Sequence, residues 1–169
     1  MTVPPLLIPV LAAALFCAAI AVHAATRDTA QPINIRAHSV DANEKTGVSV
    51  YRGNVVMTQG TLRLNADRVE VHNRDGRVER VRAWGEPARL QTRTDRGEEL
   101  RGRAARIEYH AATRRIDLYG SAELNRNDDV FRGNVVHYAI DDQTFSAEGK
   151  DDGQVSAVIQ PTKPAPAAQ

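Results

Sequence analysis

Four histidines follow the apolar N-terminal segment of the chain, at His38, His72, His110 and His137. His72 and His110 occupy equivalent places in two successive sequence repeats, so neighbouring strands could bring their imidazoles close together. A zinc site would also need a third ligand and groups that orient the imidazoles, and no spacing in this chain is typical of such a site. We expect no metal site and interpret these histidines as polar residues at strand ends.

Carboxylates are the second kind of side chain that could do chemistry, and five of them recur between apolar positions: Asp41, Asp67, Glu70, Glu108 and Asp117. An enzyme that cleaves polysaccharides would place a pair of acids in one groove. Here the acids alternate with arginine, as in Asp67-Arg68 and Arg106-Glu108, which predicts charge pairs across strands on a solvated face. The chain also has no nucleophile elbow, P-loop or glycine-rich dinucleotide turn. We expect no catalytic residue, no cofactor and no enzyme.

The elements that carry these residues are predicted by a repeated apolar pattern. Apolar, glycine or tyrosine residues follow the spacing +2, +2, +3, +2 in four copies: Ile33-Ile35-Ala37-Val40-Ala42, Leu62-Leu64-Ala66-Val69-Val71, Leu100-Gly102-Ala104-Ile107-Tyr109 and Phe131-Gly133-Val135-Tyr138-Ile140. Alternation with period two indicates a strand with one buried face. A single shift of phase indicates a bulge or bend that keeps the apolar side chains on the inside.

Second strands lie between these copies and have an alternation of their own. Their inward positions are predicted at Val48, Val50, Val55 and Met57, at Val81, Ala83, Ala88 and Leu90, and at Ile116, Leu118, Ala122 and Leu124. A glycine stands at the break in each, at Gly53, Gly85 and Gly120, where a bent strand favours a residue without Cβ. Turn residues at 43–47, 73–76, 112–114 and 141–142 separate the strands.

These patterns predict an all-β fold without a helix. Units of roughly thirty residues form V-shaped pairs of bent strands, and the units stack into a solenoid-like folded sheet that is open at both ends. The inside is predicted to be an apolar trough. Small inward residues favour free space between its walls: Ala37, Ala66, Gly102, Ala104 and Gly133.

The two ends of the chain differ in composition from the repeats. We interpret residues 1–24 as a secretory leader that is cleaved after Ala24, because an uncharged apolar run from Leu6 to Val22 precedes this cleavage site. The alternative, a membrane anchor, would need about 20 residues, and Pro9 interrupts the run. The single cysteine, Cys17, lies in this leader, so residues 25–161 are expected to form one domain without disulfides. Residues 162–169 are rich in proline and alanine and are expected to be disordered.

The charge balance argues against nucleic acid as a partner. The chain has 22 Lys and Arg against 21 Asp and Glu, a net charge of +1, whereas phosphate binding needs a clustered basic excess. An arginine-rich stretch, residues 74–106, could meet lipid phosphates at the rim of the trough. Because acidic residues are interleaved with these arginines, the sequence favours an ordinary solvated surface there.

Several segments together resemble a known family. They are Gln31-Pro32-Ile33-Asn34-Ile35, the stretch 53–61, Asn65-Ala66-Asp67-Arg68-Val69, Gly85-Glu86-Pro87-Ala88, and the stretches 145–150 and 155–161. In this order they resemble the LptA (OstA) family of periplasmic lipopolysaccharide-transport proteins. The resemblance implies a β-jellyroll that carries lipopolysaccharide across the periplasm, with acyl chains in the trough.

The resemblance also implies partners and lipid-contacting residues. The partners would be lipopolysaccharide, an inner-membrane LptC-like jellyroll, the periplasmic domain of an outer-membrane LptD-like translocon, and further copies of the chain joined head to tail. Lipid contact is expected at twelve inward positions: Ile33, Ile35, Ala37, Leu62, Leu64, Ala66, Val69, Leu90, Ile107, Leu118, Phe131 and Tyr138. The alternative is a structural periplasmic adaptor that joins proteins through its sheet edges and carries no lipid.

Overall fold

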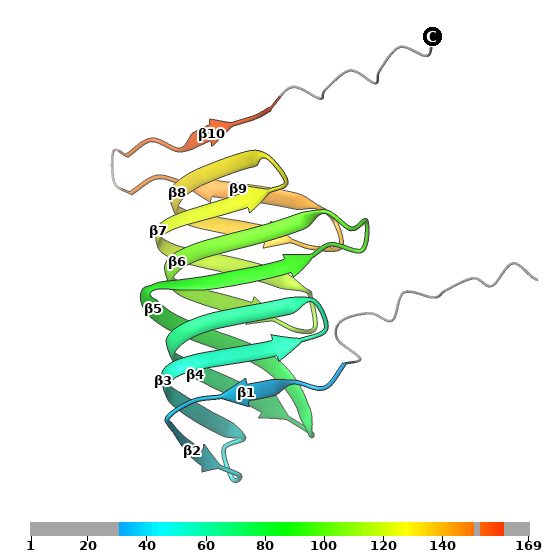
Figure 1. Ribbon diagram of the computed structural model, residues 1–169, viewed down its shortest axis with the longest axis vertical. Coiled ribbons are helices and arrows are strands. Elements are labelled where there is room, and N and C mark those ends of the chain that lie inside the picture. Colours follow the sequence, from blue (N-terminus) through cyan, green and yellow to red (C-terminus); the bar gives the residue numbers. More distant parts are fainter. Residues whose placement is uncertain (1–30, 151–152, 161–169) are drawn as a thin grey trace, which may run out of the picture.

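The computed structural model describes residues 31–150 and 153–160, and these residues form only strands and turns (Figure 1). The strands are β1 (Asn34–Arg36), β2 (Ser39–Asn43), β3 (Val48–Gln59), β4 (Leu62–Arg74), β5 (Arg77–Arg93), β6 (Glu99–His110), β7 (Arg115–Arg126), β8 (Asp129–Ala139), β9 (Thr144–Glu148) and β10 (Ser156–Val158). Within these residues no helix is long and apolar enough to cross a membrane. The predicted leader and C-terminal tail lie outside the described residues.

All ten strands belong to one antiparallel sheet. Its order is β1-β3-β4-β5-β6-β7-β8-β10, while β2 also pairs with β3 and β9 with β8. From β2 to β9, strands that follow one another along the chain therefore pair with each other, as tight turns favour. The sheet begins at β1 and β2 and ends at β9 and β10, so the prediction of edges at opposite ends of the stack is confirmed.

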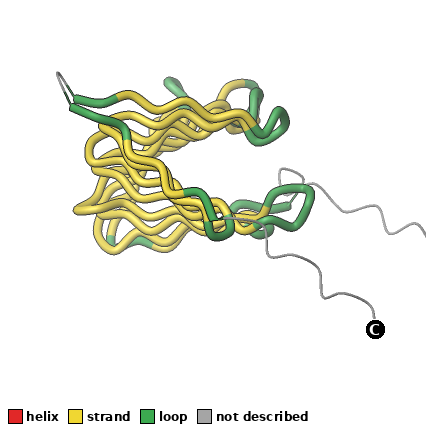
Figure 2. Tube along the Cα trace, turned by 90° about the horizontal axis from the view of Figure 1, so that it is seen from above, coloured by secondary structure: helices red, strands yellow, loops and turns green. Residues whose placement is uncertain are grey.

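Each long strand bends once, and the bends divide the sheet into two walls. The pairing registers shift between Arg52 and Val55 in β3, and shifts recur at equivalent places in the pairings from β4 to β8. Seen along the stack, the sheet has a C-shaped cross-section with turns on both lips (Figure 2). The turns at 44–47, 75–76, 111–114 and 140–143 end the first wall, and those at 60–61, 94–98 and 127–128 end the second.

Glycines make two of these bends sterically accessible. Gly53 has a φ of 81°, and a Cβ at this position would lie 2.6 Å from Nδ1 of His38. Gly120 has a φ of 78°, and its Cβ would lie 3.1 Å from the Cβ of Ala105. Left-handed backbone of this kind favours glycine, so the prediction that glycine marks the break in these strands is confirmed.

The predicted phase of the first half of β3 is wrong. Tyr51 pairs with Val69 and packs against the core, while Val50 pairs with the outward Glu70. The inward positions are thus Ser49 and Tyr51 rather than Val48 and Val50. The bends contain different numbers of residues in different strands, and alternation alone does not fix that number.

The fourth repeat also departs from its predicted phase at one position. Val136 is fully buried and pairs with Leu118, while Val135 pairs with Tyr119 on the outer side. The phase shift therefore follows Gly133, two positions earlier than the pattern predicted. With adjacent valines, only the pairing partner on β7 decides which of the two faces inward.

Candidate functional site

The inner faces of both walls form one continuous apolar surface. Nine of the twelve residues predicted to contact lipid belong to its buried core: Leu62, Leu64, Ala66, Val69, Leu90, Ile107, Leu118, Phe131 and Tyr138. The other three, Ile33, Ile35 and Ala37, are partly buried and pack against this core. The structure therefore brings all twelve to the inside, as period-two alternation requires.

Residues next to these positions face the other way. Ile35 pairs with Met57 on the inner side, whereas its neighbour Asn34 is exposed. Leu64 is buried, and its neighbour Arg63 is exposed. Inward and outward positions thus lie only one residue apart but point to opposite faces of the sheet.

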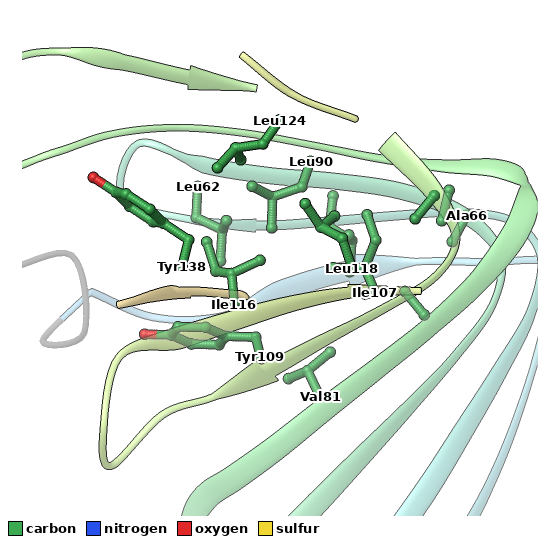
Figure 3. Packing of buried hydrophobic residues seen from close by; sticks show 14 of the residues in the cluster. Leu62, Ala66, Val81, Leu90, Ile107, Tyr109, Ile116, Leu118, Leu124 and Tyr138 are labelled. Atoms are coloured by element: carbon green, nitrogen blue, oxygen red, sulfur yellow. The ribbon is translucent and has the colours of Figure 1, made fainter. Parts of the chain in front are cut away.

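Side chains from the two walls meet directly in the middle of the stack. Leu62, Leu90 and Leu124 of the second wall face residues of the first wall such as Ile116 (Figure 3). A Cβ on Gly102 of the second wall would lie 3.1 Å from Cδ2 of Leu118 on the first. The interior is therefore packed here like a protein core.

This packing corrects the prediction that small inward residues leave free space. Ala66 and Ala104 lie beside the bends, where the walls converge, and both are buried. Gly102 is covered by Leu118. Large side chains lie nearer the lips, and in Figure 3 the hydroxyls of Tyr109 and Tyr138 lie on the side away from Ala66. The small residues thus match the taper of the V rather than a cavity.

A wide cleft opens between the walls toward the β1 end of the stack. Its volume is about 610 Å³, and it is lined by residues of both walls: Gln31, Ile33, Met57, Gln59, Arg74, Arg77, Val78, Glu79, Val81, Tyr109, Ala111 and Ala112. Apolar side chains form its inner part, and Arg74, Arg77 and Glu79 contribute charge. A site of this size and character suits an amphipathic ligand.

The opposite end of the stack has a different geometry. Phe131 of the second wall and Phe145 of the first have ring centroids 4.0 Å apart. Toward the β9 end the two walls therefore meet through an aromatic contact.

Burial raises the pKa of Tyr138, a neighbour of Phe145 across the strand pair, so its hydroxyl stays neutral in the apolar interior.

The lips of the two walls are joined by an arginine. Arg114, in the β6–β7 turn, donates to both carboxylate oxygens of Asp95 in the β5–β6 turn, over 3.0 and 3.2 Å. Its Nη1 also lies 2.7 Å from Oδ1 of Asp141. The hydrogen bond to Asp95 is the main cause that raises the pKa of Arg114.

The outer face carries the charged pairs that the sequence predicts. One row crosses five strands as Glu70, Arg82, Glu108, Asp117 and His137. Within it Arg82 lies 3.9 Å from both Glu70 and Glu108. Opposite charges on neighbouring strands attract one another, so these two contacts confirm the prediction of cross-strand pairing, although Glu108 lies opposite another acid, Asp117.

Asp117 is an exception to the prediction of a solvated position, because its side chain is fully buried. His137 Nδ1 lies 2.7 Å and His110 Nε2 3.0 Å from its carboxylate, and Arg115 Nη2 donates to it over 3.0 Å. These partners cover the carboxylate and tie β6, β7 and β8 together. In the described part of the chain no three histidine, cysteine or carboxylate side chains are grouped as metal ligands.

A second charged cluster lies on the outside of the second wall. Glu123 accepts hydrogen bonds from Arg103 at 2.8 Å, Arg132 at 2.7 Å and Asn125 at 3.1 Å. Burial alone would raise its pKa, but these hydrogen bonds outweigh burial and lower the pKa of Glu123 to about 2.

The comparison with known proteins fits this geometry. Residues 34–144 match the family described as LptA/(LptD N-terminal domain) LPS transport protein. The chain belongs to this family. The lipopolysaccharide export system protein LptA of Escherichia coli K12 is 32% identical over 156 residues, 91% of this chain and 84% of that protein. The export system protein LptH of Pseudomonas aeruginosa is 30% identical over 147 residues, 82% of this chain and 84% of that protein.

A solved structure shares the LptA-family fold. The crystal structure of LptH, the LptA-homologous periplasmic component of the lipopolysaccharide transport device from Pseudomonas aeruginosa, superposes with a TM-score of 0.74 at 27% identity. The match covers 79% of this chain and 99% of the other. The predicted family and the predicted all-β folded sheet are thereby confirmed.

Sequence reasoning missed part of the cleft. Arg77, Val78 and Ala111 line it, although none was predicted as a site residue. Val78 lies three residues before Val81 and so breaks the period-two alternation of β5; it packs against the core because the β4–β5 register shifts between His72 and Asn73, which the sequence does not report. The cleft itself arises where residues 31–33 approach the β4–β5 and β6–β7 turns. These segments are far apart in the sequence, so no local pattern predicts their contact.

Proposed function

We propose that this chain is a periplasmic carrier that binds the acyl chains of lipopolysaccharide between its two walls. In this proposal it bridges the inner and outer membranes by head-to-tail assembly, with further copies and with LptC-like and LptD-like jellyrolls at the ends. The leader would be cleaved after Ala24. The observation that carries the proposal is the inner apolar surface, which continues from β1 to β8 in a family of lipopolysaccharide-transport proteins.

The proposed mechanism is transfer of acyl chains from water to an apolar surface. Each buried CH₂ contributes about 0.8 kcal/mol, so several acyl chains bind strongly without any polar anchor. The cleft beside Ile33 and Met57 offers the first place for them, because apolar side chains there border open space. Transport through such a carrier needs no catalytic residue in the chain, and its energy would come from another component.

Photo-cross-linking from the two faces of one strand tests this proposal. A cross-linking residue at Ile35 or Leu64 should capture lipopolysaccharide in cells, because both side chains face inward. The matched controls are Asn34 and Arg63, which lie next to Ile35 and Leu64 in the same strands but point to the outer face. Equal capture from both faces would refute binding between the walls.

The alternative function, an adaptor without lipid, predicts a different result. Mass spectrometry of the purified protein should find co-extracted lipopolysaccharide if the chain is a carrier. A protein that is free of lipid and still joins its partners through β1 and β10 would favour the adaptor.

A further inference from the structure

The turns at the two lips belong to hairpins that alternate along the stack. The β6–β7 turn, which carries Arg114, ends the first wall, and the β5–β6 turn, which carries Asp95, ends the second. Ion pairs on the outer faces, such as Arg82–Glu108, link strands within one wall. The Arg114–Asp95 pair instead crosses from one lip to the other, over the open side of the C-shaped section.

The contact between Arg114 and Asp95 has the geometry of a specific, bidentate ion pair. Two guanidinium nitrogens of Arg114 reach two oxygens of Asp95, and such forked pairs are the more specific kind of ion pair. The side chain of Arg114 is only 12% exposed. Asp141, in the β8–β9 turn on the same lip, also contacts Nη1 of this guanidinium, and the backbone amide of Ile140 donates to the carbonyl of Arg114 over 3.1 Å.

The interior directly beneath Arg114 is nearly full. The cavity there has a volume of about 20 Å³ and is lined by both walls, including Leu62 and Thr92 of the second and Tyr109 and Ile116 of the first. Space of this size holds about one water molecule, so no acyl chain fits at this height while the walls keep this separation. Deeper in the V, Leu118 fills the space beside Gly102. Lipid can pass only if the walls move apart.

We propose that Arg114 and Asp95 form a latch that holds the two lips together in the middle of the stack, and that acyl chains pass this height only when the latch opens. This inference rests on the proposed carrier function for its ligand, but the latch itself is a property of the fold. A lipid bound in the cleft at the β1 end would lie next to the latch, because Tyr109 lines both the cleft and the small cavity beneath Arg114. The pair thus separates a loading region from the rest of the path.

Asp95 and Asp141 make a matched pair of test positions. Both are exposed carboxylates of lip turns that bind the same guanidinium, but only Asp95 lies on the opposite wall. Asp95→Ala should therefore open the latch, while Asp141→Ala removes a partner of Arg114 and keeps the contact across the lips. Circular dichroism should show the same β spectrum for both variants, since neither side chain belongs to the core.

The separation of the lips is measured first, without lipid. Spin labels at Thr113→Cys and Asp128→Cys, exposed turn positions on opposite lips, report this distance in a chain that also carries Cys17→Ser. Asp95→Ala should lengthen or broaden the distance distribution, and Asp141→Ala should leave it unchanged. An unchanged distribution in Asp95→Ala, or equal changes in both variants, would overturn the latch.

Uptake of fluorescein-labelled lipopolysaccharide is measured second. Asp95→Ala should accelerate uptake about fivefold over Asp141→Ala, the factor that one ion pair of this kind supplies. Equal uptake rates in both variants would overturn the gating role. If no variant captures the probe although the lips separate in Asp95→Ala, the carrier function is wrong and the latch stands.

Discussion

Asp117 shows how a single residue on the outer face stabilises three strands. Its carboxylate is fully buried and is contacted by His110, His137 and Arg115. Asparagine in its place keeps one acceptor oxygen but places an NH₂ donor against these partners and leaves Arg115 without its carboxylate, and breaking a buried ion pair from one side is strongly destabilising. Asp117→Asn should lower the free energy of unfolding by about 3 kcal/mol, measured by urea denaturation. Asp67→Asn, at an exposed carboxylate, is the control and should change it by less than about 0.5 kcal/mol.

Glu123 predicts a dependence of stability on pH. Its pKa is about 2 in the folded protein, below the ordinary value of 4.5, so the charged form stabilises the fold at pH values above 4.5. This contribution is lost as the pH falls from 4.5 toward 2. Because Arg103 and Arg132 are half-exposed, we expect about 2 kcal/mol rather than the full value of the shift.

The measurement compares the chain with its Glu123→Gln variant in urea at several pH values. The variant should be less stable at pH 7, and the difference should shrink between pH 4.5 and pH 2. A difference that stays constant over this range would mean that Glu123 does not titrate as the structure implies.

The bend of each strand is the element that turns a flat sheet into two walls. Gly53 and Gly76 both have positive φ, but only at Gly53 would a Cβ meet another residue, at 2.6 Å from His38 Nδ1. Gly76→Ala should cost about 1 kcal/mol for the backbone alone, and Gly53→Ala about 2 kcal/mol, because His38 must also move. Hydrogen exchange should show faster exchange of the His38 amide in Gly53→Ala only. If the two variants lose the same stability and exchange the His38 amide at the same rate, Gly53 has no special role at the corner between β1 and β2.

The elements also show which features a single sequence can predict. Alternation identified the inward faces of β4 and β6 correctly, because each strand has one buried face and a three-residue step at its bend. It failed at Val50 and at Val135, where the number of residues in the bend differs or two valines adjoin. The burial of Asp117 and the contact of Arg114 with Asp95 depend on neighbours far along the chain, and no local spacing reports them.

At the scale of the whole molecule the two ends are not equivalent. The β1 end has the cleft of about 610 Å³, and the β9 end has the Phe131–Phe145 contact between the walls. In the proposed carrier, ligand would therefore enter and leave in different surroundings. In a head-to-tail array the open end of one copy would face the aromatic end of the next, which gives the path a direction.

The exposed apolar residues gather at these ends. The large hydrophobic side chains that are exposed among the described residues are Val40, Phe145, Val155, Val158 and Ile159. Val40 lies on β2, and the others lie on or beside β9 and β10. An unpaired strand that also exposes apolar side chains is a template for a further strand.

We expect concentration-dependent rods to form through these edges. The β1–β2 edge and the β9–β10 edge differ, so the contact between copies is heterologous and does not close into a dimer. Deletion of residues 155–161 should leave a monomer in sedimentation velocity, while deletion of residues 162–169 is the control and should leave the rods intact. Rods formed by the chain that lacks 155–161 would contradict pairing through β10.

Mixing two blocked chains tests the direction of assembly. A chain with Ile35→Lys and Val40→Lys carries charges on both strands of its β1–β2 edge but keeps β10, and the chain that lacks residues 155–161 keeps β1 and β2 but has lost β10. Each alone should be a monomer, because its one intact edge finds no intact complementary edge. Together they should form one-to-one dimers that grow no further, since each supplies the edge that the other lacks. Dimers formed by either chain alone would show that like edges pair, and the head-to-tail arrangement would then be wrong.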